Sequence, residues 1–420
     1  MSTTFISAAD PHRPARTEAE RGDARRDFYA FALWVLVTFV QFRFDELLLY
    51  PLALYFTYAA WRNQVQILGL LRRSWILLSF PVWCLISPLW AVEPAAAFKE
   101  ALYLMLTMLI CYQVAASLTP RQIMYAVLLA TGIIVVANLL KIYGSGDGSN
   151  GIFVHKNQMG KNMVVAWIVA TAVMLDPGSA RKLRWIAGCI ALLAAYSAFI
   201  SGSATAVLLV LGTAAVNLFG ATMLRGGLLR ARRLAVLCLM VGSIFGAATL
   251  VLPHTEVDPV EPVLEAFGKD RSLTGRTGLW EYAEQQISAE PFLGVGSGGF
   301  WRYHDSPLVR RIFEEYYKGP RAKFNFHNSF FEISVHQGLI GLGLAILSTL
   351  WAFGWLIRGA FSLASMSQIY FFSQSLAVIA RMFTESGFLA PFVIFHMLFW
   401  IGALSASKSH MERARSGRSA

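Results

Sequence analysis

Residues 121–143 read RQIMYAVLLATGIIVVANLLKIY, and no charged residue interrupts the stretch between Arg121 and Lys141. An α-helix of about 20 residues crosses the roughly 30 Å hydrocarbon core of a bilayer, so this run predicts a transmembrane helix. Similar runs recur along the 420-residue chain, which is 56% hydrophobic and 15% charged. Soluble domains carry about a quarter charged residues. We therefore expect an integral membrane protein.

Working outward from this block, we expect an all-α polytopic membrane protein with about 12 transmembrane helices and a large periplasmic loop that caps its outer face. The predicted helices are 28–44, 45–61, 74–92, 99–118, 121–143, 158–175, 183–200, 205–224, 233–252, 329–356, 368–386 and 388–406. The polar first 27 residues lack the pattern of a cleaved signal. The predicted organisation is a cytoplasmic tail over 1–27, helices one to nine over 28–252, a periplasmic loop over 253–328, helices ten to twelve over 329–406 and a cytoplasmic tail over 407–420.

The basic residues set the predicted orientation. The formal net charge is +11, but lysine and arginine lie mostly in short connections between apolar blocks, which fits membrane topology and argues against a nucleic-acid partner. With a cytoplasmic N-terminus, 21 of them fall inside and only five fall in the short outer connections. The sequence therefore predicts an inner-membrane protein with both termini in the cytoplasm.

The predicted outer loop has two unlike halves. Residues 253–290 hold eight acids and three bases, whereas residues 291–328 hold three acids and six bases. Helical patterns at 278–288 and 307–317 indicate a folded cap, as is common for long loops with a function.

The strongest local signal is His327-Asn328, followed after nine residues by Gly338-Leu339-Ile340-Gly341. His327 falls at the predicted outer end of a helix, and imidazole is suited to proton transfer near neutral pH. Glu332 follows a little more than one turn later. The alternative interpretation is a plain helix start, with Asn328 or Ser329 as its cap and His327 at the membrane interface.

A second signal is Leu273-Thr274-Gly275-Arg276-Thr277, which places one arginine before an amphipathic helix, where a bound phosphate is favourable. A solvated loop arginine is the alternative. The glycine-rich segment 291–301, PFLGVGSGGFW, is similar to a phosphate loop, but it lacks the strand–turn–helix setting and the following Lys-Ser/Thr.

Two further groups of polar residues fall near the predicted outer face. Lys156, Asn157 and Lys161 begin a transmembrane helix, where they either hold a lipid diphosphate or anchor the helix at the interface. Arg381 and Glu385 are four residues apart and can pair on one helix face. Charges at membrane depth are costly and usually functional, although a structural ion pair is the alternative here.

These residues together resemble the O-antigen ligase/polymerase superfamily of bacterial membrane glycosyltransferases. The resemblance covers roughly residues 80–400 and rests on the His327 and Arg276 motifs. It also rests on the segments Ser87-Pro88-Leu89-Trp90-Ala91-Val92-Glu93-Pro94, His155-Lys156-Asn157-Gln158-Met159-Gly160 and Thr384-Glu385-Ser386. Gly294-Val295-Gly296 with Phe300-Trp301 is most similar to the exopolysaccharide polymerase branch.

The resemblance implies a GT-C-like fold and an inverting glycosyl transfer at the periplasmic face that needs no metal and no cofactor. The implied donor is an oligosaccharide on undecaprenyl diphosphate; the acceptor is a glycan for a polymerase or lipid A-core for a ligase, and polysaccharide export machinery is an implied partner. By motif, His327 resembles the catalytic histidine and Arg276 the arginine that binds the diphosphate. The substrate-binding candidates are Lys156, Asn157, Lys161, Arg302, Asn328, Glu332, Arg381 and Glu385.

One position departs from the family pattern. Relatives often carry Arg or Lys after the second serine of Ser201-Gly202-Ser203, where this chain has Ala204. Lys156, Lys161, Arg302 and Arg381 are the candidates to compensate. Three functions compete: a polymerase, a ligase, and a non-enzymatic flippase of lipid-linked oligosaccharide. Because the basic motifs cluster at the outer connections and not along a central cavity, the sequence favours an enzyme, and the motif types favour a polymerase.

Overall fold

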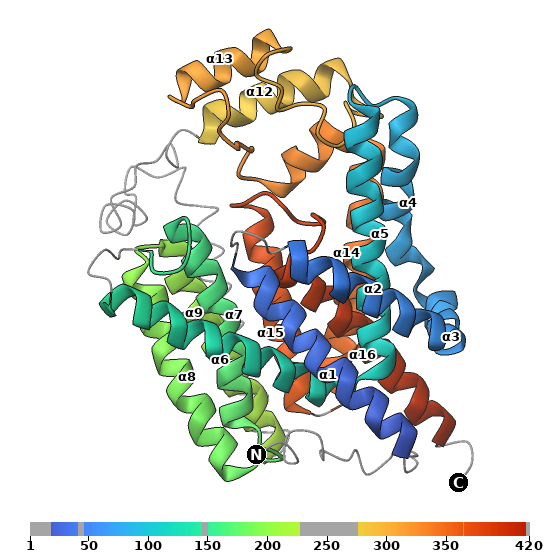
Figure 1. Cartoon of the computed structure of the whole chain (residues 1–420), viewed down its shortest axis with the longest axis vertical. Helices are drawn as coiled ribbons and strands as arrows, with labels where there is room; N and C mark the ends of the chain where they lie inside the picture. The colour runs from blue at the N-terminus through green and yellow to red at the C-terminus, as the bar shows by residue number, and fades with distance from the viewer. Residues whose placement is uncertain (1–17, 41–45, 145–149, 227–275, 364, 417–420) are drawn as a thin grey trace.

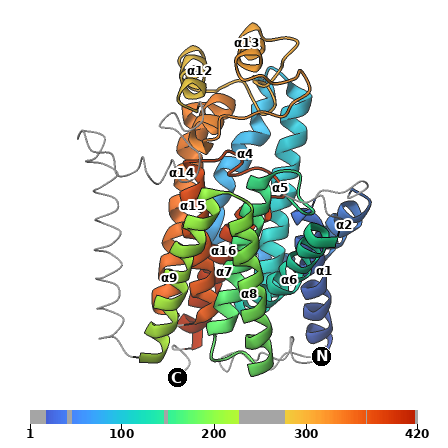
Figure 2. The same ribbon diagram turned by 90° about the vertical axis from the view of Figure 1, so that its left-hand side faces the viewer.

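The computed structural model describes residues 18–40, 46–144, 150–226, 276–363 and 365–416. These residues form an elongated bundle of helices with two short helices lying across one end (Figure 1). The view turned by 90° shows the same arrangement (Figure 2). The described residues contain no β-strand. The expectation of a helical membrane protein is confirmed at this level.

Among the described residues, seven helical segments are long and apolar enough to cross a membrane. They are Gln64–Leu89, Pro94–Ser117 (α5), Pro120–Gly144 (α6), Lys156–Leu175 (α7), Arg181–Ile200 (α8), Ala204–Leu224 within α9 (Ala204–Gly226), and Ser329–Ser362 (α14). The first combines α3 (Gln64–Ser74), η1 (Trp75–Leu78), α4 (Ser79–Ile86) and η2 (Ser87–Leu89). It begins ten residues before the predicted start at 74.

Four other helices pack in the same bundle without meeting the length or hydropathy of a span. They are α1 (Glu18–Phe39), α2 (Glu46–Arg62), α15 (Met366–Met382) and α16 (Ile394–Ser416). The prediction of a helix at 233–252 lies outside the described residues, so a total of 12 spans stays a prediction. The predicted helix start at 388 is wrong, because residues 383–393 form turns and α16 begins at Ile394.

A helix break in α14 is the feature that links the bundle to the residues above it. Gly338 has φ 66° and ψ −178°, a backbone conformation that only glycine adopts readily. The break opens the backbone of α14 to the glycine-rich segment 291–299. The N–H groups of Val295 and Gly296 donate to the carbonyls of Val335 and His336, and Leu339 donates to Pro291.

The glycines of this junction therefore have a packing function. A Cβ added at Gly338 would lie 2.0 Å from the carbonyl oxygen of Phe292. The segment around Trp90 closes the junction from the other side, because the Trp90 indole donates to Leu293 O and Val92 N–H donates to Val295 O. The glycine-rich segment thus fastens to a broken helix, and its resemblance to a phosphate loop is superficial.

Residues 276–328 form a small unit, which we call the cap, over the end of the bundle (Figures 1 and 2). Its helices α12 (Arg276–Ala289) and α13 (Pro307–Glu315) agree with the helical patterns predicted at 278–288 and 307–317. The hydroxyl of Ser306 caps α13 by accepting from Val309 N–H. A separate aromatic core holds the cap together, with Phe300, Phe313 and Phe326 among its buried members.

Candidate active site

His327 lies where the cap joins α14. It has φ 51°, which is uncommon for a residue with a side chain. The backbone N–H of His327 donates to Asn325 Oδ1, which helps to hold this conformation. The following residue, Asn328, is the N-cap of α14 and accepts from the N–H groups of Phe330 and Phe331. The helix-start interpretation is correct for Asn328, whose side-chain oxygen is fully used in capping.

The two predicted catalytic residues meet on one carboxylate. Nδ1 of His327 lies 3.4 Å from Oε2 of Glu385, and a guanidinium nitrogen of Arg276 lies 3.7 Å from Oε1. The three side chains are between 14% and 29% exposed, so they form a partly enclosed site that solvent still reaches. They come from three different parts of the chain: the start of α12, the residue before the α14 cap, and the turns after α15.

The site assigns the two ring nitrogens of His327 different roles. An ionised carboxylate only accepts hydrogen bonds, so Nδ1 carries the proton and donates to Glu385. In the neutral imidazole, Nε2 is then the nitrogen without a proton and can accept one. Burial by itself would raise the pKa of Glu385. The hydrogen bond from His327 and the positive charges of Arg381 and Arg276 outweigh burial, and the pKa of Glu385 lies below its usual value.

Two further cations surround the same carboxylate. Arg381 is buried in the last turn of α15, and Lys161 is half-buried in the second turn of α7. Both cations interact electrostatically with Glu385, and they also interact with each other. The guanidinium of Arg381 also lies 5.5 Å from the centre of the Phe395 ring. The predicted helical pairing of Arg381 with Glu385 changes in the structure, because α15 ends at Met382 and the Glu385 carboxylate turns to His327 and Arg276.

The turn that carries Lys161 is packed against the loop that contains Ala204. A Cβ at Gly160 would come within 3.1 Å of Ala206 Cβ, Ser203 Cβ and Ser201 Oγ, so only glycine permits this close approach. Lys161 is therefore adjacent to the loop where the sequence lacks a cation. Among the four candidates to compensate for Ala204, Lys161 and Arg381 lie in the charged cluster.

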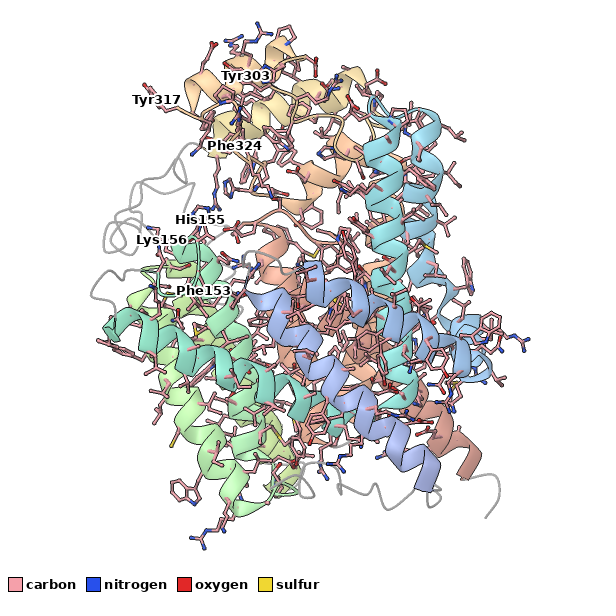
Figure 3. The ribbon with its side chains drawn as sticks, viewed as in Figure 1. Phe153, His155, Lys156, Tyr303, Tyr317 and Phe324 are labelled. Carbon is pink, nitrogen blue, oxygen red and sulfur yellow. The ribbon has the colours of Figure 1, made fainter. Side chains whose placement is uncertain are left out.

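The remaining predicted site residues have other surroundings. Arg302 pairs with Glu93 at 3.1 Å and with Asp305 at 2.9 Å, which fastens the cap to the start of α5. Lys156 and Asn157 are exposed on the first turn of α7. Figure 3 shows Lys156 beside His155 at the end of α7 that faces the cap, below Phe324.

Glu332 holds the backbone next to His327. Its Oε2 accepts from Phe326 N–H at 2.9 Å, the residue directly before His327, and its Oε1 accepts from the Trp301 indole at 2.9 Å. His336 lies on the same side of α14, with Nε2 at 3.3 Å from Oε1 of Glu332 and Nδ1 at 2.9 Å from Gly296 O. Both carboxylate oxygens of Glu332 are thus used by the protein, so this residue positions His327.

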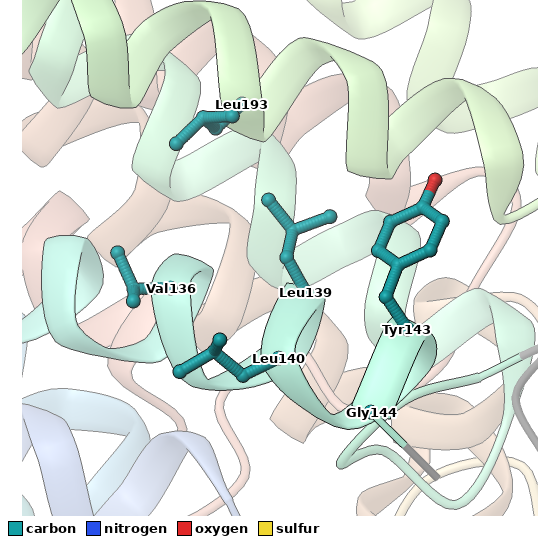
Figure 4. Close-up of a pocket in the computed structure, with 6 residues that line it drawn as sticks. All are labelled: Val136, Leu139, Leu140, Tyr143, Gly144 and Leu193. Carbon is teal, nitrogen blue, oxygen red and sulfur yellow. The ribbon is translucent and has the colours of Figure 1, made fainter. Parts of the chain in front are cut away.

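An apolar pocket of about 440 Å³ lies apart from the charged cluster, between α6 and α8 (Figure 4). Its lining residues are Val136, Leu139, Leu140, Tyr143, Gly144 and Leu193. None of them carries a charge or an acid–base group suited to catalysis. The pocket therefore offers no cation for a phosphate group, and the cluster around Glu385 is the candidate site.

Sequence reasoning found the residues of the cluster but missed how they connect. Glu385 was expected as the helical partner of Arg381, and its role as the common partner of His327 and Arg276 was not expected. The signal that could have found it is Thr384-Glu385-Ser386, a small polar segment between apolar blocks that the family resemblance already includes.

Comparison with known proteins shows the family of the chain. A family model described as O-Antigen ligase matches residues 189–346. The exopolysaccharide production protein ExoQ of Rhizobium meliloti (strain 1021) is 30% identical over 342 residues, which cover 78% of this chain and 76% of that relative. The family resemblance read from the motifs is thereby confirmed. This chain is a membrane protein that belongs to the exopolysaccharide branch of the O-antigen ligase superfamily.

Proposed function

We propose that this protein is a polysaccharide polymerase. It transfers a glycan from an undecaprenyl-diphosphate donor to a hydroxyl of an acceptor sugar at the periplasmic face of the inner membrane. The observation that carries the proposal is the convergence of His327 and Arg276 on Glu385, at the junction of the cap and the bundle.

The charge of the cluster supports a diphosphate donor. Arg276, Arg381 and Lys161 contribute three positive charges, and Glu385, the carboxylate with which all three interact, contributes one negative charge. Uncompensated charge is costly in a partly enclosed site, so an anionic ligand is favoured there. A diphosphate at the level of the membrane surface supplies the missing negative charge, and fixed cations stabilise it further as it leaves.

The histidine supports direct transfer. Nε2 of His327 accepts the proton of the acceptor hydroxyl, whose oxygen forms a bond to the anomeric carbon of the donor sugar. The bond between that carbon and the diphosphate oxygen breaks, and the electron pair leaves with the diphosphate. Glu385 holds the imidazole by accepting from Nδ1 and stabilises the imidazolium that forms, as a carboxylate does in a catalytic triad. Attack from the side opposite the diphosphate inverts the anomeric centre.

The relative named above supports a polymerase over a ligase. The protein that is 30% identical is named for exopolysaccharide production. A ligase would use the same donor and the same histidine but would require lipid A-core as its acceptor. A flippase would need no base, and it gives no reason for the contact between His327 and Glu385.

The test is an elongation assay with the purified full-length protein in lipid nanodiscs. Lipid-linked repeat units are supplied alone, or together with lipid A-core, without ATP. A polymerase lengthens the glycan in the absence of lipid A-core, and His327→Ala abolishes the product. A product that forms only when lipid A-core is present identifies a ligase. Movement of the lipid-linked glycan across liposomes without any change in its length overturns the enzyme proposal.

A further inference from the structure

Tyr317 lies two residues after the last residue of α13, at a position where glycine is usual. The N–H of Lys318 donates to Phe313 O at 2.7 Å and the N–H of Tyr317 donates to Glu314 O at 3.2 Å, the hydrogen-bond pattern of a Schellman motif. In this motif the residue after the cap adopts a left-handed conformation, and Tyr317 does so with φ 51°. A side chain at this position costs stability that glycine would not cost.

The ring of Tyr317 adds almost no packing to the fold, because the residue is 96% exposed. Figure 3 shows Tyr317 projecting from the outer edge of the cap. An exposed aromatic ring on a strained backbone is typical of a residue that serves binding, since it costs the fold stability.

Three cations follow this tyrosine directly. Lys318, Arg321 and Lys323 are exposed, and the segment 316–331 contains no acidic residue. In the described parts of the chain no carboxylate lies within 4 Å of these three side chains. A positive patch of this kind attracts an anion.

The patch is continuous with the catalytic histidine. Nζ of Lys318 lies 5.4 Å from the centre of the Phe324 ring, and that centre is 6.3 Å from the centre of the His327 ring. Tyr316 packs on the same phenylalanine at 5.6 Å. Figure 3 shows Phe324 between Lys156, at the end of α7, and the outlying Tyr317. We call the exposed cations Lys318, Arg321 and Lys323, together with Tyr317 and Phe324, the strip; Lys318 and Phe324 connect it to His327.

We infer that this strip binds an acidic polysaccharide, one that carries carboxylate groups, along the path between the active site and the outside. The inference rests on the proposed function and names its substrate class. Aromatic rings stack on the faces of sugar rings, while lysine and arginine pair with carboxylates, so the strip has both groups that an acidic glycan needs. An anionic lipid surface is the competing ligand, but Tyr317 lies farther from the bundle than Phe324 (Figure 3).

The experiment measures binding without turnover. Full-length protein in nanodiscs of zwitterionic lipid is titrated with fluorescent oligogalacturonate and with a neutral maltodextrin of equal length. We expect roughly tenfold tighter binding of the anionic probe, and a preference that weakens as salt is added. The triple variant Lys318→Ala/Arg321→Ala/Lys323→Ala removes the preference. The control Arg72→Ala/Arg181→Ala/Lys182→Ala, with the same loss of charge at exposed residues elsewhere, retains it.

Tyr317→Gly separates binding from folding. Glycine suits the left-handed position, so the variant should melt at the wild-type temperature or higher while its affinity for both probes falls. A lower melting temperature with unchanged affinity would mean that the ring is structural. Equal affinity for the two probes in wild type overturns the inference, as does a triple variant that changes binding only to phosphatidylglycerol vesicles. We expect His327→Ala to keep the preference for the anionic probe. The binding result therefore does not depend on the outcome of the elongation assay.

Discussion

The imidazole of His327 and the carboxylate of Glu385 meet across 3.4 Å although 58 residues separate them in the chain. The carboxylate accepts from Nδ1, and in the proposed mechanism Nε2 is therefore the nitrogen that takes the proton of the acceptor hydroxyl. It also joins α14 to the turns after α15, since Ser329 Oγ donates to Glu385 O at 2.7 Å. The base and the residue that orients it are thus held by one junction.

Replacing the base should remove transfer without unfolding the protein. We expect His327→Ala to lower the elongation rate by about 10²–10⁴-fold, the usual contribution of a general base. Glu385→Gln should lower the rate as well, because a neutral amide does not stabilise the imidazolium. Initial rates and a melting curve for each variant test this. The exposed His304 is the matched control, and its alanine variant should behave as wild type. Full activity in His327→Ala would remove this residue from the mechanism.

Lys161 and Lys156 lie on the same helix and give a matched pair. We expect Lys161→Met to weaken donor binding about tenfold or more, because one cation of the diphosphate site is lost. The same variant should raise the melting temperature of the donor-free protein, since Lys161 repels Arg381. Lys156→Met, at the exposed start of α7, should change both quantities less. Binding of undecaprenyl diphosphate and thermal melting are the measurements; a Lys161→Met variant with wild-type affinity contradicts the assignment.

Two glycines of α14 test the helix break. Gly338→Ala should destabilise the protein by about 3 kcal/mol or more, because the residue has φ 66° and its Cβ would strike Phe292 O. Gly343→Ala, which meets no atom within 4 Å, should be neutral or stabilise by about 0.5–1 kcal/mol. Denaturation midpoints of the two variants in the same detergent provide the comparison. Similar midpoints would show that the break is dispensable.

The pH dependence of stability follows from Glu385. Its pKa in the folded protein lies below the usual value, so the folded state favours the charged form. The stabilisation is complete at neutral pH and is lost as the pH falls through that lowered pKa, below about 4.3. We expect wild type to melt higher than Glu385→Gln at pH 7 and the difference to shrink at pH 4 and below. A difference that does not change with pH contradicts the ion-pair role.

The glycine-rich segment illustrates how far the sequence could be interpreted. Its composition is similar to a phosphate loop, and the missing strand–turn–helix setting argues against a nucleotide site. Its partner could not be predicted, because Val295 meets Val335 only through the break at Gly338. Arg302 is a similar case: the sequence offered it as a phosphate contact, and the fold pairs it with Glu93, more than 200 positions earlier in the chain.

The sequence by itself determined the membrane class, most helix positions, the two cap helices and the chemical identity of the site residues. Those properties depend on local composition and on short spacings, which the chain carries without reference to its fold. Tertiary structure alone decided that His327, Arg276, Lys161 and Arg381 share Glu385, and that Asn328, Glu332 and Arg302 serve the scaffold. These outcomes depend on helices that are distant in sequence packing side by side, and a contact of that kind leaves no periodic trace in the residues that make it.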